Sequence, residues 1–150
     1  MAAIVIAGCG GNGGSSGATD TEGVEIAAVK TAKVGDLGAV LVDEEGRTLY
    51  DFDEDKGTTY LAKASACYGA CAKNWPPLLT GGEPESESGV LSTKLGILKR
   101  KDGTLQVTYF GHPLYTYVGD IEPGEANGND LKAFGGEWYA LQPDGEEPED

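Results

Sequence analysis

The chain has 150 residues and a formal net charge of −14, with 25 acidic residues against 11 basic ones. This balance argues against nucleic acid as a partner, because phosphates are bound through basic patches. It also argues against direct attraction to anionic lipid, and we interpret it as solubility in an extracellular or salty medium. The length fits one compact domain with tails, large enough to bury a core.

The chain begins with an apolar stretch, residues 1–8, that is far too short to span a bilayer. It runs into Ile6-Ala7-Gly8-Cys9, which resembles a bacterial lipobox: an aliphatic residue and two small residues before a cysteine that is cleaved and lipidated. We interpret residues 1–8 as a partial lipoprotein signal peptide and Cys9 as the lipidation site. The alternative is an apolar N-terminus that is not processed.

A Gly/Ser-rich stretch follows and is too polar and too flexible to form a core. We interpret residues 9–23 as a tether that holds a folded domain off a membrane. The membrane is then a partner that the protein reaches through its N-terminal lipid.

The folded domain is expected over residues 24–143, and its first part has the pattern of β-strands. A Val/Ala-rich segment over 24–33 begins the first strand. Strands over 37–42 and 47–52 flank a turn with Gly46, so we expect a β-hairpin here. Asp53 then opens a polar loop.

One short helix is expected over residues 62–74, of about two turns because it contains Gly69. Trp75-Pro76-Pro77-Leu78 ends it, since proline cannot continue a helix. Residues 80–93, rich in Gly and Glu, are interpreted as a linker.

The second part repeats the pattern of strands and turns. Asp102-Gly103 is a strong hairpin signal. An acidic tail, residues 144–150, closes the chain. The expected strands cover 95–99, 104–109, 114–118 and 137–142.

Two copies of one motif occur at a common offset, Tyr50-Asp51-Phe52-Asp53-Glu54-Asp55 and Tyr115-Thr116-Tyr117-Val118-Gly119-Asp120. Such a repeat indicates one structural unit used twice. We therefore predict a mainly β fold of two pseudo-repeated, hairpin-based units (34–79 and 94–143) packed together, with one short helix near Cys67 and Cys71. The equivalent motif residues are Tyr50, Phe52 and Asp55 in the first unit and Tyr115, Tyr117 and Asp120 in the second.

These residues resemble a bacterial family of predicted lipoproteins, a secreted repeat of unknown function with a Tyr-x-aromatic-x-x-Asp motif. Cys67-x-x-x-Cys71 leading into Trp75-Pro76-Pro77-Leu78 is also similar to that family. The resemblance implies an exported protein anchored by lipid to the outer face of the bacterial cytoplasmic membrane. It implies no enzyme activity.

Cys67 and Cys71 are four residues apart, which on a helix puts their Cα atoms about 6 Å from each other, within reach of a disulfide. In an exported protein a structural disulfide is the expected state. A redox-active dithiol and a metal site remain alternatives.

The sequence predicts no cofactor and no resident metal. His112 is the single histidine, and one His with two spaced Cys falls short of a zinc or haem site, so we interpret it as a turn residue in the position equivalent to Arg47. The acidic run that begins at Asp53 departs from the EF-hand pattern, whose sixth position is glycine where Thr58 stands here. Asp55 and Asp120 are expected to accept backbone hydrogen bonds after their strands, with a cation site of another kind as the alternative.

Two classes of function fit these observations. The first is a non-enzymatic binding or structural module of the cell envelope, with a protein or a small molecule as an unidentified ligand. The second is an envelope protein for redox chemistry or for metal or haem handling, using the Cys67/Cys71 pair and His112. Hydrolase and transferase chemistry is less supported, because the chain carries neither a Gly-x-Ser-x-Gly motif nor a phosphate-binding loop.

Overall fold

A computed structural model of the chain describes residues 24–55 and 64–148. The predicted signal peptide (1–8), the lipidation site Cys9 and the tether (9–23) lie outside the described residues. So do the first two residues of the predicted helix and the last two of the acidic tail.

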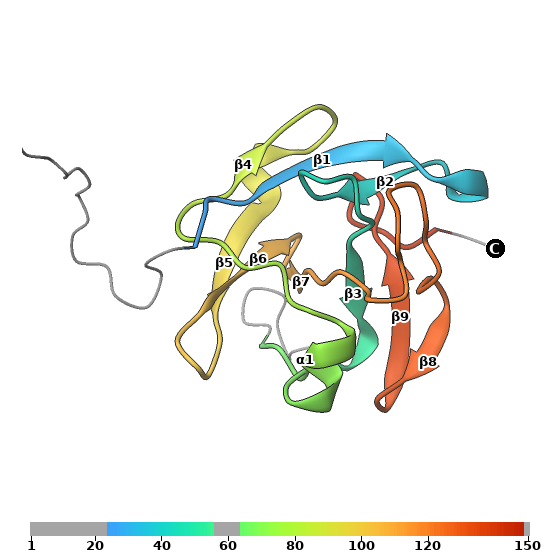
Figure 1. Cartoon of the computed structure of the whole chain (residues 1–150). Coiled ribbons are helices and arrows are strands. Elements are labelled where there is room, and N and C mark those ends of the chain that lie inside the picture. Colours follow the sequence, from blue (N-terminus) through green and yellow to red (C-terminus); the bar gives the residue numbers. More distant parts are fainter. Residues whose placement is uncertain (1–23, 56–63, 149–150) are drawn as a thin grey trace, which may run out of the picture.

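Over the described residues the fold is mainly β, as predicted, with one short α-helix (Figure 1). The nine strands found there form three small sheets, with strand orders β2-β1-β4, β3-β9-β8 and β5-β6-β7. The elements are β1 (Ala28–Lys33), β2 (Ala39–Val42), β3 (Tyr50–Phe52), α1 (Ala70–Asn74), β4 (Glu85–Ser86), β5 (Leu95–Lys99), β6 (Leu105–Tyr109), β7 (His112–Pro113), β8 (Leu131–Ala133) and β9 (Gly136–Ala140).

The first predicted hairpin does not continue into a regular strand pair. The chain turns as expected after β2, and Val42 bridges Thr48. Beyond that point the chain diverges from β2, and β3 pairs with β9 of the second repeat (Figure 1). In this pairing Tyr50 lies opposite Ala140, and Phe52 lies opposite Trp138. The central sheet is therefore built from both repeats.

The strands at the centre are buried on both faces. Successive residues of β2 enter alternate hydrophobic clusters, because side chains in a strand point to opposite faces: Val40 and Val42 enter one, and Leu41 enters the other. The chain entering β3 does the same, with Leu49 in the second cluster and Tyr50 in the first. This explains the nearly continuous apolar runs in these segments.

The helix is shorter than predicted: α1 has five residues and begins after Cys67. Gly69, with φ +60° and ψ −127°, sets the chain direction just before it. A backbone with that φ is outside the right-handed helical region and favours glycine. Residues 64–68, which the prediction included in the helix, are not helical.

The segment interpreted as a linker is part of the fold. Thr80 is buried, and its hydroxyl accepts a hydrogen bond from the Ala27 amide at 3.0 Å. Further on, β4 pairs in parallel with β1. These bonds fix the crossing between the repeats against the first strand.

The last strand is β9, close to its predicted position, and it forms a hairpin with β8, which the sequence analysis did not predict. After β9 the beginning of the acidic tail forms a turn, in which the Gly145 amide donates to the carbonyl of Gln142 at 2.8 Å. A Cβ atom on Gly145 would lie 2.4 Å from the ring of Phe110, so glycine permits this close approach.

Candidate functional site

The repeated motif is joined across the two repeats by reciprocal hydrogen bonds. The Tyr50 hydroxyl donates to Asp120 Oδ2 at 2.6 Å, and the Tyr115 hydroxyl donates to Asp55 Oδ2 at 2.6 Å. All four residues are buried. The tyrosine of each copy thus bonds the aspartate of the other copy. We call this pair of bonds the Tyr–Asp interlock.

The second oxygen of each aspartate holds the loop of its own repeat. Asp55 Oδ1 accepts a hydrogen bond from the Ala66 amide at 2.6 Å. Asp120 Oδ1 accepts one from the Asn127 amide at 2.8 Å. The expectation that both aspartates accept backbone hydrogen bonds is confirmed, and the interlock adds a second bond to each carboxyl group.

The main chain repeats this reciprocity at the centre of the molecule. The Tyr50 amide donates to the Tyr115 carbonyl at 2.8 Å, and the Tyr115 amide donates to the Tyr50 carbonyl at 3.0 Å. Equivalent residues of the two repeats therefore face each other, as they do at a two-fold axis. The two units pack on one another as predicted, and they do so around Tyr50 and Tyr115.

Four aromatic rings stack in a column that alternates between the repeats. Trp75 and Trp138 form its centre, with ring centroids 3.9 Å apart and planes at 5°. Tyr117 covers the other face of Trp75 at 4.1 Å, and Phe52 covers the other face of Trp138 at 4.0 Å. Offset-stacked aromatic pairs contribute about 0.5–1.5 kcal/mol each beyond the area that they bury. Tyr117 is half-buried, and the other three rings are buried.

The interlock tyrosines meet the column edge-on. Tyr50 contacts Trp75 with centroids 5.4 Å apart, and Tyr115 contacts Trp138 at 5.2 Å. Gly128 lies against the Trp75 ring within the column, and a Cβ atom there would be 2.6 Å from that ring. The polar interlock and the apolar column are therefore parts of one packed unit.

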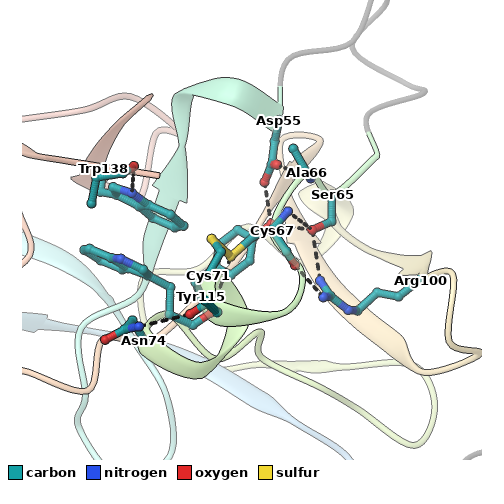
Figure 2. Close-up of a disulfide and its surroundings, with 12 residues drawn as sticks. Asp55, Ser65, Ala66, Cys67, Cys71, Asn74, Arg100, Tyr115 and Trp138 are labelled. Atoms are coloured by element: carbon teal, nitrogen blue, oxygen red, sulfur yellow. Dashed lines mark hydrogen bonds between the residues drawn. A yellow bond between two sulfur atoms is a disulfide. The ribbon is translucent and has the colours of Figure 1, made fainter. Parts of the chain in front are cut away.

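The predicted disulfide is present, and Figure 2 shows it beside the interlock. Cys67 and Cys71 are bonded with their Cα atoms 5.2 Å apart. Both residues are buried. Cys67 lies before α1 and Cys71 lies within it, so the bond ties the loop to the helix instead of joining two residues of one helix.

A buried arginine, which the sequence analysis did not single out, supports the same loop. Arg100 donates to the Cys67 carbonyl at 2.6 Å and to Ser65 Oγ at 2.9 Å (Figure 2). It also donates to Gln106 Oε1 at 2.8 Å. Ser65 Oγ lies 2.7 Å from the Tyr115 hydroxyl, which links Arg100 to the interlock. No sequence pattern distinguishes this arginine from Lys99 and Lys101, its exposed neighbours.

Arg47 and His112, the equivalent positions flanking the motif, both reach into the other repeat. Arg47 Nη1 donates to the carbonyl of Asp120 at 2.8 Å. His112 Nδ1 lies 3.4 Å from Asp51 Oδ2. The two side chains thus connect the repeats, and they do so through different acceptors.

The electrostatics of the interlock keep its tyrosines protonated. Burial, followed by the interaction with Asp120, raises the pKa of Tyr50 far above the ordinary value of 10.0. Burial and the charge of Asp55 raise the pKa of Tyr115 in the same way. Burial also raises the pKa of Asp120, although its hydrogen bonds act in the opposite direction. Side chains with such fixed protons hold structure and are poor general bases at neutral pH.

The described residues provide neither a metal-binding cluster nor a membrane-spanning helix. Residues 24–55 and 64–148 contain no group of three or more His, Cys, Asp or Glu side chains placed to hold a metal ion. No helix among these residues is long and apolar enough to cross a bilayer.

The fold and the interlock define this protein as a domain of two interlocked β repeats. A comparison with protein families matches residues 31–79 and 96–142 to the secreted repeat of unknown function. The chain belongs to this family. Searches of curated proteins and of solved structures each return no match.

We expect both aromatic pairs to stabilise the whole domain. Tyr50→Ala/Phe52→Ala and Tyr115→Ala/Tyr117→Ala should each leave the chain largely unfolded, since a buried aromatic contributes about 3–5 kcal/mol and a domain has about 5–15 kcal/mol in total. The second pair should cost somewhat less, because Tyr117 is half-buried. Thermal unfolding of the unaltered chain should be one transition by circular dichroism and fluorescence. Two separated transitions would contradict a shared core.

The raised tyrosine pKa values predict a loss of stability in alkali. Below about pH 10 the interlock tyrosines are protonated in the folded and in the unfolded chain, and their contribution to stability is complete. Above about pH 10 they ionise first in the unfolded chain. The free energy of unfolding therefore falls by about 1.4 kcal/mol per pH unit for each interlock tyrosine. Urea unfolding between pH 8 and pH 11 measures this slope. Tyr50→Phe should be less stable at pH 8 and should lose stability more slowly above pH 10. Parallel curves for the two chains would contradict the assignment.

Proposed function

We propose that this protein is an exported, lipid-anchored, non-enzymatic module of the cell envelope that binds a partner or serves a structural role. Its anchor is Cys9 on the outer face of the bacterial cytoplasmic membrane. Membership of a family of secreted repeats supports export. The observation that carries the proposal is the use of the repeated motif itself: the interlock occupies the polar groups of Tyr50, Tyr115, Asp55 and Asp120.

A motif spent on internal bonds has a structural role. A catalytic acid or base must reach its substrate, and its pKa should lie near the working pH. Tyr50 and Tyr115 are buried, and their pKa values are far above neutrality. Recognition by this protein is therefore a property of the outer surface that the interlock supports.

The segment before the domain suits a tether. Its Gly/Ser-rich composition is typical of a tether, and a random-coil chain of about 15 residues spans roughly 20 Å on average and at most about 50 Å. A lipid at Cys9 would keep the domain near the membrane while leaving it free to rotate. Contacts made by the domain then occur within the envelope.

The anchor is tested by changing its attachment residue. The full precursor, produced in a bacterial host with an intact export signal, should partition into the detergent phase. Cys9→Ser should move to the aqueous phase, because the lipid is the membrane-binding group. Retention of both forms in the aqueous phase would contradict the anchor without affecting the folded domain.

The alternative redox function receives less support. Thiol–disulfide exchange requires access of an attacking thiolate to a sulfur atom. Cys67 and Cys71 are buried, and the Cys67 carbonyl is held by Arg100. The bond is better placed to stabilise the loop that carries Ser65 and Ala66. Metal or haem handling through His112 also receives little support, since that side chain faces Asp51 across the repeat boundary.

A glutathione titration separates the two functions. We expect the native disulfide to resist a redox buffer at about −220 mV, because buried structural disulfides have potentials below about −300 mV. Thiol labelling followed by intact-mass measurement reports the bond. The folded sample and the urea-unfolded control both carry Cys9→Ser, so that Cys67 and Cys71 are the remaining cysteines. The control should be labelled at both of them after reduction. Rapid reduction of the folded protein would favour the redox function.

A further inference from the structure

Two hairpins of the second repeat have the same dipeptide, Phe-Gly, in their two-residue turns, with similar backbone angles. Phe110-Gly111 joins β6 to β7 with φ values of 51° and 81°, and Phe134-Gly135 joins β8 to β9 with φ values of 56° and 89°. Two-residue loops with both φ values positive favour Asn-Gly, Asp-Gly or Gly-Gly. A bulky residue at the first position is an outlier.

Internal packing accounts for the first phenylalanine. The Phe110 ring meets Tyr109 edge-on at 5.1 Å, Lys94 Nζ lies 5.0 Å from its centroid, and Gly145 fits against it. Phe134 differs, because 47% of its surface is exposed at the tip of its hairpin. The same unfavourable turn is thus kept at a position where the ring is presented to solvent.

The exposed ring borders a shallow acidic groove of about 540 Å³ between the β8–β9 hairpin and the 3-10 turn Asp53–Asp55. The glycine at 136 allows the two walls to approach, since a Cβ atom there would lie 2.6 Å from Glu54 Cγ. Lys132, the one cation among the described residues that line the groove, lies 3.7 Å from the carboxylate of Glu137. The charged lining of this groove is Asp53, Glu54, Lys132 and Glu137.

We propose that this groove docks an arginine-bearing, cationic segment of another exported protein. A guanidinium group can stack on the face of Phe134 while it pairs with a carboxylate such as that of Glu54. Lysine satisfies this arrangement less well, because it lacks the planar fork of arginine. The proposal names a partner class for the binding module proposed above and rests on that function.

The charge of the whole chain supports the same choice of partner. A net charge of −14 speeds the approach of a cationic segment and repels anionic ones. An aromatic ring surrounded by polar residues is also the usual composition of a contact that dominates binding energy.

The test uses the full chain carrying Cys9→Ser, so that its outcome is independent of lipidation. The probe is the amidated peptide Gly-Arg-Gly-Arg-Gly, titrated at low ionic strength and followed by amide chemical shifts in NMR spectra. The lysine counterpart Gly-Lys-Gly-Lys-Gly is titrated in parallel. We expect shifts concentrated at residues 133–137 and 53–54, and tighter binding of the arginine peptide.

Phe134→Asn separates recognition from folding. Asparagine suits the positive φ, so this variant should have a melting temperature equal to or above that of the parent, while binding of the arginine peptide weakens about tenfold. Phe110→Asn should lower the melting temperature, because that ring is packed. Ile121→Ala, at a loop residue with 71% exposure, should leave binding unchanged.

The proposal would be overturned by unchanged peptide affinity in Phe134→Asn, by shifts spread evenly over the acidic surface, or by no saturable binding of the arginine peptide. None of them bears on the anchor at Cys9, which the detergent partition tests separately. Equal affinity for the two peptides would also overturn it, since simple charge attraction would then account for the binding.

Discussion

The rest of this structure depends on the reciprocal hydrogen bonds between two copies of one motif, in which the tyrosine hydroxyl of each copy donates to the aspartate of the other. A buried carboxyl group is costly unless its oxygens are hydrogen-bonded. Asp55 and Asp120 meet that requirement only when the other repeat supplies Tyr115 and Tyr50. Each repeat therefore needs the other to satisfy its polar atoms, and the two form a single folding unit.

The aromatic column follows from the same arrangement. Because equivalent residues face each other at the centre, Trp75 and Trp138 meet and are flanked by Tyr117 and Phe52 in alternating order. The disulfide is an addition to the first repeat, where it holds the loop that contacts Tyr115 through Ser65. Polar satisfaction, ring stacking and the covalent bond thus stabilise one central region.

A core of this kind leaves recognition to the periphery. The four interlock residues of the repeated motif are buried, and the groove beside Phe134 is lined by the β8–β9 hairpin and by Asp53 and Glu54, two residues of the first motif copy that take no part in the interlock. Phe134 occupies a turn position that glycine or asparagine would fit better. Phe110 occupies the same kind of turn, but its ring is supported by packing. The contrast between these two turns distinguishes a ring kept for the fold from one presented to a partner.

The sequence by itself determined the β class, the two repeats, the equivalent motif positions and the Cys67–Cys71 pairing, because periodicity, spacing and internal similarity are local properties of the chain. It could not assign the partners of the motif. Tyr50 is five residues from Asp55, yet it bonds Asp120, and β3 pairs with β9 instead of completing its hairpin. The role of Arg100 and the exposure of Phe134 were equally inaccessible, since neither residue type nor spacing separates them from neighbouring turn residues. Tertiary structure decided these features, because burial and hydrogen-bond partners depend on which distant segments come together.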